Sequence, residues 1–300
     1  MTLRKARDLY PAKVGVVDGD RTFTYARIGE RVNSLARFFQ TRDIKPRDRI
    51  SILEVNSLAF LETYYAAAGI GAILNPLNYR LAPQEIAYIL RDSGSRWLVA
   101  GSRFASLVKG ILDEDTPLEG ILQIGDSPSF PEGITCYEYE NVIHSHAGIF
   151  EPVAIREDDV AHLYYTSGTT GRPKGVMLTH KNVCFHALGT IAELKLTDSD
   201  IWGHIAPMFH LADAWAAFAI TWVGGCHVMV AQFEAEAVMA TIERERITLS
   251  NMIPTMLNLM IKHPKVGEFD FSSLRVILSG GAPIAPEVVR RIMEAIGCDY

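Results

Sequence analysis

The sequence of 300 residues has few cysteines, and the four that occur are scattered along the chain. No Cys-x-x-Cys pair is present. We therefore interpret them as small buried side chains of a protein in a reducing compartment, which predicts a cytoplasmic location. They stand at Cys136, Cys184, Cys226 and Cys298.

A basic stripe is also missing. The net charge is −6, with 35 acidic residues against 29 lysines and arginines. Binding to nucleic acid needs clustered positive charge that neutralises phosphates, so this composition argues against a nucleic-acid partner. The densest basic cluster, residues 42–49, is interrupted by Asp43 and Asp48 and is typical of a solvated turn.

Long apolar runs are rare, and the N-terminus lacks the apolar stretch of a signal peptide. The single stretch long enough to suggest a membrane span, residues 214–231, is interrupted by Gly224, Gly225 and His227. It is better explained by a buried helix, a glycine turn and a buried strand. With 48% apolar and 21% charged residues, the composition predicts a globular protein without a transmembrane segment.

Helix-like and strand-like segments alternate, which predicts an α/β fold in layers. We expect a division near residues 156–159 into a first α/β subdomain, 1–157, and a second, 158–300. Residues 102–156 contain several prolines and are expected to be less regular. Helices are expected over 26–40, 59–71, 84–92, 182–194, 234–246, 254–262 and 286–296, and strands over 49–54, 73–78, 97–100, 201–206, 226–230, 248–253 and 274–278.

The most distinctive segment, residues 164–180, reads Tyr-Tyr-Thr-Ser-Gly-Thr-Thr-Gly-Arg-Pro-Lys-Gly-Val-Met-Leu-Thr-His. Its polar middle offers almost no apolar side chains to bury, and glycine and proline interrupt regular hydrogen bonding, so we expect neither a helix nor a central strand. Backbone N–H groups, hydroxyls and one ammonium can converge there on an oxyanion. The segment therefore predicts a phosphate-binding loop.

Two familiar phosphate-binding motifs do not fit this segment. In a P-loop, a hydroxyl residue follows the lysine, whereas Gly175 follows Lys174 here. Gly168 and Gly171 are three residues apart, which also differs from the glycine spacing of a P-loop, and a Rossmann Gly-x-Gly-x-x-Gly motif does not fit either. The remaining alternative is a flexible polar surface loop.

The order of residues in this segment closely resembles the signature of the AMP-forming adenylating enzymes, which include acyl- and aryl-CoA synthetases, luciferases and peptide-synthetase adenylation domains. Shorter segments resemble other signatures of that family in the same order, at residues 23–32, 69–81, 207–210 and 279–283. The resemblance covers essentially the whole chain. It implies the layered αβαβα N-terminal domain of the acyl-adenylate-forming enzymes, incomplete at its C-terminal end.

The resemblance also implies roles for individual residues. Lys174 would place a positive charge on the leaving pyrophosphate, whereas Arg172 is expected to be exposed. His210 would lie between the substrate carboxylate and the α-phosphate. Loop residues that would bind the β- and γ-phosphates of ATP are Thr166, Ser167, Gly168, Thr169, Thr170 and Gly171, and those that would lie beside adenine are Gly281, Ala282 and Pro283.

Met208, Phe209 and Trp215 are candidates for the lining of an acyl pocket, although ordinary core packing is an equal alternative. Amino-acid-activating relatives carry an aspartate at the position of His210, so the histidine predicts an acid without an α-amine. The other histidines considered receive no role: His162, His180, His186, His204, His227 and His263.

The reaction that the resemblance implies is activation of a carboxylic acid, with a fatty acid favoured, by ATP and Mg²⁺ to acyl-AMP, followed by transfer to CoA. Alternatives are an acyl-AMP ligase that loads a carrier protein and a non-catalytic nucleotide-binding fragment. Groups that hold Mg²⁺ and ribose in relatives, and a small C-terminal domain with a catalytic lysine, are absent from residues 1–300. These residues alone are therefore expected to be inactive, and a homodimer is compatible with the sequence.

Overall fold

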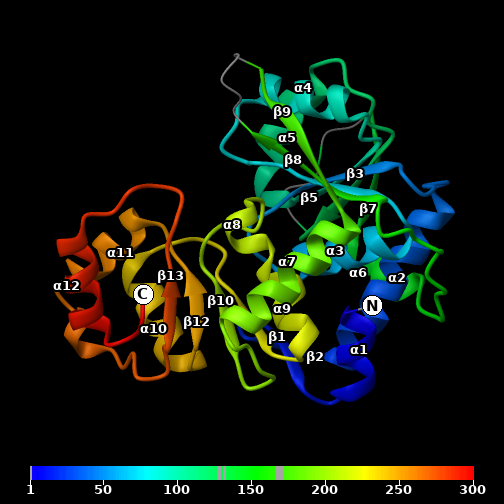
Figure 1. Ribbon diagram of the computed structural model, residues 1–300. Helices are drawn as coiled ribbons and strands as arrows, with labels where there is room; N and C mark the ends of the chain where they lie inside the picture. Colours follow the sequence, from blue (N-terminus) through cyan, green and yellow to red (C-terminus); the bar gives the residue numbers. More distant parts are fainter. Residues whose placement is uncertain (1, 127–129, 131–132, 167–171) are drawn as a thin grey trace. The chain divides into compact units, whose positions relative to one another are not determined.

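The computed structural model describes residues 2–126, 130, 133–166 and 172–300. Its chain divides into two compact units (Figure 1). Unit 1 consists of Met1–Ala26, Asn56–Leu58 and His186–Tyr300, and unit 2 consists of Arg27–Val55 and Ala59–Phe185.

Unit 1 contains a six-stranded sheet in the order β13-β12-β10-β11-β1-β2. All its neighbouring strands are parallel except the β1–β2 hairpin, which is antiparallel. Parallel neighbours need crossover connections, and the helices between the strands supply them. The strands are β1 (Val14–Asp18), β2 (Arg21–Thr24), β10 (Ile201–His204), β11 (Cys226–Met229), β12 (Leu249–Asn251) and β13 (Val276–Leu278).

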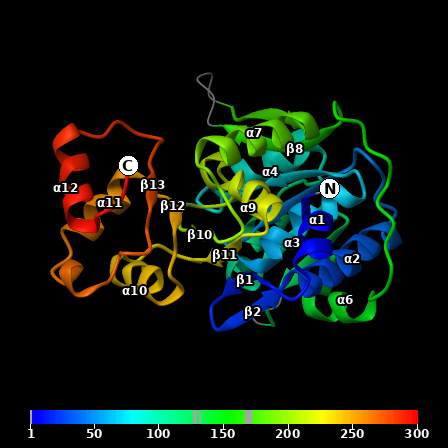
Figure 2. The same ribbon diagram turned by 60° about the horizontal axis from the view of Figure 1, so that its bottom comes forward.

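The helices of unit 1 bury apolar faces against this sheet. In α10, Val238, Met239 and Ile242 are fully buried, as their spacing of one helical face requires. The carboxylate of Glu234 accepts hydrogen bonds from the first free N–H groups of α10 and thereby caps its N-terminus. Figure 2 shows α10, α11 and α12 beside β12 and β13. The helices are α1 (Thr2–Leu9), α8 (Leu211–Ala214), α9 (Ala216–Val223), α10 (Ala235–Glu245), α11 (Pro254–Ile261), the short η2 (Val266–Glu268) and α12 (Pro286–Ile296).

Unit 2 contains a seven-stranded sheet in the order β7-β6-β5-β3-β4-β8-β9. Only the terminal pair, β8 and β9, is antiparallel. Its strands are β3 (Arg49–Leu53), β4 (Ile73–Pro76), β5 (Trp97–Gly101), β6 (Gly120–Ile124), β7 (Thr135–Glu138), β8 (Val160–Thr166) and β9 (Lys174–Thr179).

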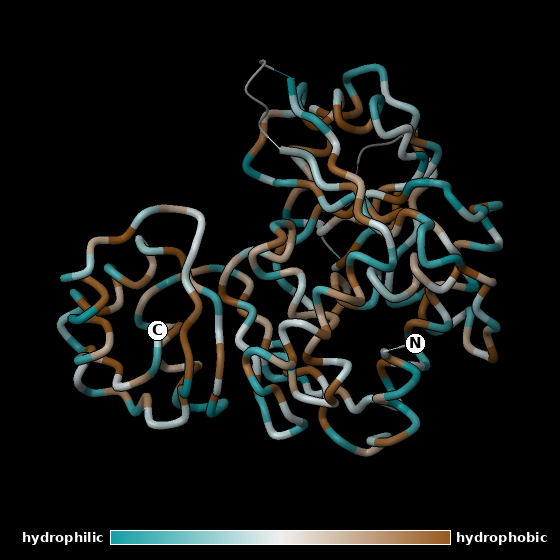
Figure 3. Tube along the Cα trace, in the orientation of Figure 1, coloured by the Kyte–Doolittle hydropathy of each residue, from teal (hydrophilic) through white to brown (hydrophobic). Residues whose placement is uncertain are grey.

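The helices that lie wholly in unit 2 are α4 (Pro83–Ser93), the short η1 (Ser102–Phe104), α5 (Ala105–Leu112) and α6 (Tyr139–Ser145). Three further helices contain residues of both units: α2 (Tyr25–Thr41), α3 (Leu58–Gly69) and α7 (His180–Glu193). Figure 3 shows hydrophobic and hydrophilic stretches alternating along the chain.

The α/β fold class is confirmed, and the expected helices and strands occur within a few residues of their predicted bounds. Residues 214–231 form the end of α8, then α9, a glycine turn and β11, as predicted. Among the described residues, no helix combines the length and the apolar character that crossing a bilayer requires.

Two expectations need correction. Residues 102–156 are more regular than their prolines suggested, because β6 is a buried strand parallel to β5 and β7 pairs with it. Residues 164–166 belong to β8, which lies between β4 and β9, and residues 174–179 form β9 at the sheet edge. The aromatic and apolar residues at both ends of this segment supply the strand-forming side chains, so only its middle lacks them.

The division into units differs from the boundary expected near residue 157. Strands β8 and β9 pair with the sheet of unit 2, and the first residues of the chain, which include β1, pair with the sheet of unit 1. Strand pairing between distant segments therefore decides the division, and no local change in composition marks it.

An ion cluster with a buried centre joins residues of unit 2 that lie on three helices. The guanidinium of Arg31, on α2, donates to Glu62, on α3, and to Glu140, on α6. The hydroxyl of Tyr139 also donates to Glu62. Burial raises the pKa of Glu62 above its ordinary value, although Arg31 opposes the shift. Since Glu62 is fully buried, its charge is compensated only inside the cluster.

We expect Glu62→Ala to lower the free energy of unfolding by about 3 kcal/mol. The substitution removes the carboxylate that accepts hydrogen bonds from the buried guanidinium of Arg31 and from the hydroxyl of Tyr139. Chemical denaturation of both proteins measures this difference. Glu30→Ala is the control, since Glu30 forms an exposed pair with Arg27, and it should change stability by less than about 0.5 kcal/mol. Equal effects of the two substitutions would contradict the prediction.

Candidate functional site

The predicted phosphate-binding loop connects β8 to β9 as a hairpin in unit 2. The cross-strand partner of Thr166, the last residue of β8, is Lys174, the first residue of β9. Tyr165 and Gly175 form the next pair. The side chains of Thr166 and Lys174 are exposed. The hairpin therefore presents a hydroxyl and an ammonium at the two ends of the loop.

Tyrosine hydroxyls anchor β8 just before the loop begins. The hydroxyl of Tyr164 lies 2.7 Å from that of Tyr64 on α3, in the interior of unit 2. The hydroxyl of Tyr165 donates to Asp92 on α4 at 2.6 Å. Burial and the carboxylate of Asp92 raise the pKa of Tyr165, so this hydroxyl keeps its proton at neutral pH. Both bonds fix the strand from which the loop departs.

Gly175 is required by the packing of β8 against β9. A Cβ atom at this position would lie 2.8 Å from Cδ1 of Leu163 and 3.1 Å from Cζ of Tyr165. Both distances are shorter than ordinary carbon–carbon contacts. The glycine that follows the loop lysine thus permits close approach of the two strands at the place where the loop is closed.

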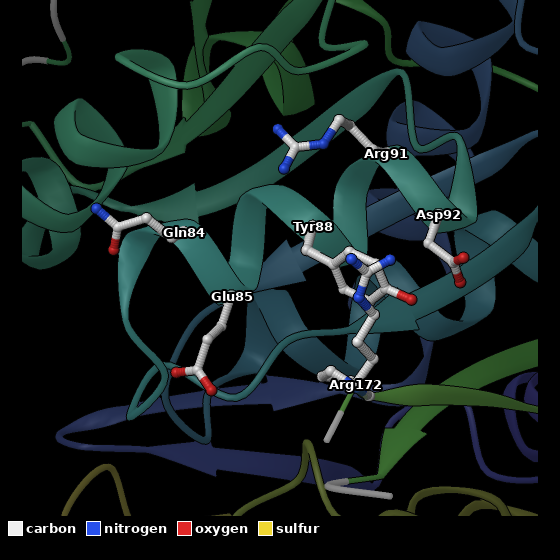
Figure 4. A pocket seen from close by; sticks show the side chains of 7 residues that line it. Gln84, Glu85, Tyr88, Arg91, Asp92 and Arg172 are labelled. Atoms are coloured by element: carbon white, nitrogen blue, oxygen red, sulfur yellow. The ribbon is translucent and has the colours of Figure 1, made fainter. Parts of the chain in front are cut away.

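A cavity of about 690 Å³ lies beside the second end of the loop. The guanidinium of Arg172 lies 5.8 Å from the ring centre of Tyr88, in the range of a cation–π contact. Figure 4 shows this pair together with Glu85 and Asp92 along α4. Arg172 is exposed, as expected from the sequence, and it contacts α4 of the same unit.

The turn that carries Met208, Phe209 and His210 follows β10 in unit 1. Met208 and Phe209 are buried, whereas the side chain of His210 is exposed. The rings of Phe209 and His210 lie 4.4 Å apart between centroids. The backbone N–H of His210 donates to the carbonyl of Pro207, which closes the turn. His210 is then the N-cap residue of α8.

Asn56 holds this turn through three hydrogen bonds. Its amide nitrogen donates to the carbonyls of His204 and Ala206, at 2.7 and 2.9 Å. Its amide oxygen accepts from the backbone N–H of Met208 at 2.7 Å. Asn56 is 4% exposed, so water cannot easily replace it. One side chain therefore supplies hydrogen-bond partners for backbone groups in the segment between β10 and α8.

We expect Asn56→Ala to accelerate amide hydrogen exchange at Met208 and its neighbours by at least tenfold, because the freed backbone groups lose buried partners. Exchange read by mass spectrometry on peptides covering residues 205–214 measures the effect. Asn78→Ala is the control, because Asn78 makes a comparable side-chain bond to the backbone N–H of Arg80 at an exposed place. Unchanged exchange over 205–214 in Asn56→Ala would contradict the role assigned to Asn56.

The turn that follows β13 contains the residues expected beside adenine. Gly281 adopts φ +81°, a conformation that favours glycine, and it is exposed together with Ala282 and Pro283. The hydroxyl of Ser279 is buried and has no hydrogen-bond partner among the described residues. Pro286 then begins α12, as predicted. The turn is thus open to solvent on its glycine side.

The predicted site residues divide between the units. Thr166 and Lys174 lie on the hairpin of unit 2, whereas Met208, Phe209, His210, Trp215 and 281–283 belong to unit 1. Trp215 is half-buried between the rings of Trp202 and His186. The remaining loop residues, Ser167, Gly168, Thr169, Thr170 and Gly171, lie outside the described residues.

Sequence reasoning missed the residues that hold these segments. Asn56 and Asp92 carry no motif, and their partners lie far along the chain. Asn56 stands beside Ser57 and near Glu54, and Asp92 lies between Arg91 and Ser93, so no local pattern singled them out. Within the described parts of the chain, no group of three or more histidine, cysteine, aspartate or glutamate side chains could hold a metal ion.

Two largely parallel sheets with helical crossovers define an α/β protein, and the Ser/Thr/Gly segment lies between the paired strands β8 and β9. The family of AMP-binding enzymes matches residues 3–300. The chain belongs to this AMP-binding enzyme family.

Individual relatives agree with this assignment. The chain is 33% identical over 297 residues to a feruloyl-CoA synthase of an Amycolatopsis species, covering 97% of this chain and 56% of that protein. It is 31% identical over 246 residues to a crotonobetaine/carnitine–CoA ligase of Salmonella typhimurium, covering 81% and 47%. The chain thus spans about half the length of the curated relatives it matches.

Solved structures show the same fold. The anthranilate CoA ligase AuaEII, in complex with anthranoyl-AMP, superposes with a TM-score of 0.93 at 25% identity, covering 99% of this chain and 57% of that one. The inhibitor-bound N-terminal domain of FACL13 from Mycobacterium tuberculosis superposes with a TM-score of 0.88 at 29% identity, covering 99% and 73%. The layered N-terminal domain expected from the sequence is therefore the fold that the chain has.

Proposed function

We propose that the full-length protein activates a carboxylic acid with ATP to give acyl-AMP and pyrophosphate, and then transfers the acyl group to CoA. The observation that carries the proposal is the β8–β9 hairpin, which closes a Ser/Thr/Gly loop between Thr166 and Lys174. Membership in the AMP-binding enzyme family and relatives named as CoA ligases support it.

Nucleotidyl transfer needs charge neutralisation and in-line placement more than covalent help from the protein. In this proposal, hydroxyls and N–H groups of residues 166–171 donate to the β- and γ-phosphates. Lys174 stabilises the negative charge on the leaving pyrophosphate. His210 contacts the acid beside the α-phosphate, and residues 281–283 lie against adenine.

The names of the relatives indicate a class of acid substrate and no individual acid. Relatives are named for feruloyl, anthranoyl and fatty acyl groups, so both aryl and aliphatic acids belong in the proposal. Met208, Phe209 and Trp215 remain the candidates for the pocket that selects among them. Met208 and Phe209 are buried, which fits core packing as well as pocket lining.

Acid-dependent exchange of pyrophosphate into ATP tests the adenylation step directly. We expect the full-length protein to show exchange with at least one acid from a panel of ferulate, anthranilate and fatty acids of several lengths. Exchange in the absence of acid is the background. No exchange above background with any acid would overturn the proposal.

An acyl-AMP ligase that loads a carrier protein is the second candidate, because the adenylation half-reaction is the same. Addition of CoA to the adenylating protein, with the thioester detected by mass spectrometry, separates the two. Acyl-CoA formation supports the ligase assignment, and accumulation of acyl-AMP without thioester favours the carrier-linked one.

Lys174→Ala should lower kcat of the exchange reaction at least tenfold, because the leaving pyrophosphate loses a positive charge that acts mainly in the transition state. Lys181→Ala is the matched control. Lys181 is another exposed lysine a short distance along the chain and pairs with Glu157 at 3.0 Å. Its substitution should leave kcat within about twofold. Equal losses in the two variants would contradict the role of Lys174.

The same proposal includes ATP and CoA as cosubstrates, Mg²⁺ arriving with ATP, a cytoplasmic location and a possible homodimer, with no nucleic-acid partner. The described residues offer no metal cage, so no step is assigned to the ion. Size-exclusion chromatography with light scattering distinguishes the homodimer from a monomer.

A further inference from the structure

A chain of four buried polar side chains runs through unit 1 beneath α8. Asp213 on α8 accepts hydrogen bonds from His204 Nδ1 and from Trp202 Nε1, both on β10. His204 Nε2 lies 2.9 Å from His227 Nδ1 on β11. His227 Nε2 lies 2.9 Å from the hydroxyl of Thr221 on α9. Asp213, His204, His227 and Thr221 are all 0% exposed.

Protons can be placed on these side chains so that each hydrogen bond of the network has one donor and one acceptor. Burial and the neighbouring His204 lower the pKa of His227 well below its ordinary value, so its ring is neutral at pH 7. Thr221 then donates to His227, His227 donates to His204, and His204 donates to the carboxylate of Asp213. A fully satisfied buried network is rigid, whereas a partly satisfied one is costly.

The network is attached to α8, which cannot be stable alone. This helix has four residues, far fewer than an isolated helix needs. Leu211 and Ala212 are exposed, so they supply little burial. The carbonyl of Ala212 accepts from Asn251 and from Trp215 Nε1, and the carboxylate of Asp213 reaches β10. Ala214 is buried, and α8 leads through Trp215 directly into α9, whose residues Ala216–Thr221 are buried. Polar bonds therefore act together with the continuation into α9 to determine where α8 lies.

His210 follows α8 because it forms the N-terminus of that helix. Its carbonyl accepts from the backbone N–H groups of Asp213 and Ala214. A displacement of Asp213 is thus transmitted to His210 through one helical turn. Displacements of about 1 Å in a reacting group can reduce rates about a hundredfold.

We propose that Asp213, through its bonds to His204 and Trp202, is a positioning residue that fixes α8 and thereby places His210 beside the acid. The inference rests on the proposed function. It gives His204 and His227 a role, although the sequence had assigned them none.

A double-mutant cycle with His210 tests the proposal in the full-length protein. We expect Asp213→Ala to lower kcat/KM of acid-dependent ATP–pyrophosphate exchange at least tenfold. In a His210→Ala background, the same substitution should lower it less than about twofold, because the residue through which it acts is gone. Equal factors in the two backgrounds would overturn the proposal.

Tyr25→Phe is the control for general loss of a buried hydrogen bond. The hydroxyl of Tyr25 donates to the carbonyl of Gly225 in the same unit, at 2.6 Å. Its substitution should change exchange by the same small factor in both backgrounds. All variants are measured well below their melting temperatures.

Asp213→Asn supplies a second test that keeps the shape of the side chain. The asparagine oxygen can accept from Trp202 while its amide donates to His204, if both histidines exchange the ring nitrogen that carries the proton. We therefore expect Asp213→Asn to retain activity within about fivefold. Activity as low as that of Asp213→Ala would show that hydrogen bonding alone does not explain the effect and would overturn the positioning role.

Amide hydrogen exchange over residues 207–215 provides a measurement that needs no activity. Asp213→Ala should accelerate it at least tenfold and Tyr25→Phe should not. Unaltered exchange in Asp213→Ala would overturn the inference. Absence of acid-dependent ATP–pyrophosphate exchange in the wild-type protein would instead contradict the proposed function, whereas amide exchange would still decide whether Asp213 fixes α8.

Discussion

The antiparallel pairing of β8 with β9 is the constraint on which the phosphate-loop half of the site depends. A loop of hydroxyl and glycine residues buries too little apolar surface to offset its own conformational entropy. Its ends must therefore be fixed by something else, and the pairing of Thr166 with Lys174 does this. Strand β9 lies at the edge of the sheet and has β8 as its neighbour, while β8 also pairs with β4.

In unit 1, buried polar side chains fix the turn that follows β10. The turn after β10 is held from one side by Asn56 and from the other by Asp213. Burying such polar groups is costly unless each one is hydrogen-bonded, so small changes in their positions lower stability. The need to pair every buried polar group, which makes burial costly, therefore also restricts the turn to one arrangement.

Local sequence patterns predicted many helices and strands of this structure, but they did not predict contacts between residues that are distant in the sequence. Apolar periodicity located helices such as α10 and strands such as β3, and the order of residues in 164–180 indicated the family. Pairing could not be predicted in this way. Asn56 is 148 residues away from one of its partners and 152 from another, and nothing in its neighbourhood indicates them. The interior position of β8 was missed for the same reason, because strand order is not a local property.

The register of two parallel strands explains how the network under α8 arises from histidines that looked unrelated. Trp202 of β10 lies opposite His227 of β11. Side chains two residues apart in a strand point to the same face, so His204 shares the face of Trp202 and of His227. A shift of the register by one residue would turn one histidine to the opposite face and break the chain of hydrogen bonds. The sheet therefore selects the partners, and burial makes their pairing obligatory; the polar network depends on the strands in the same way that the phosphate loop depends on its hairpin.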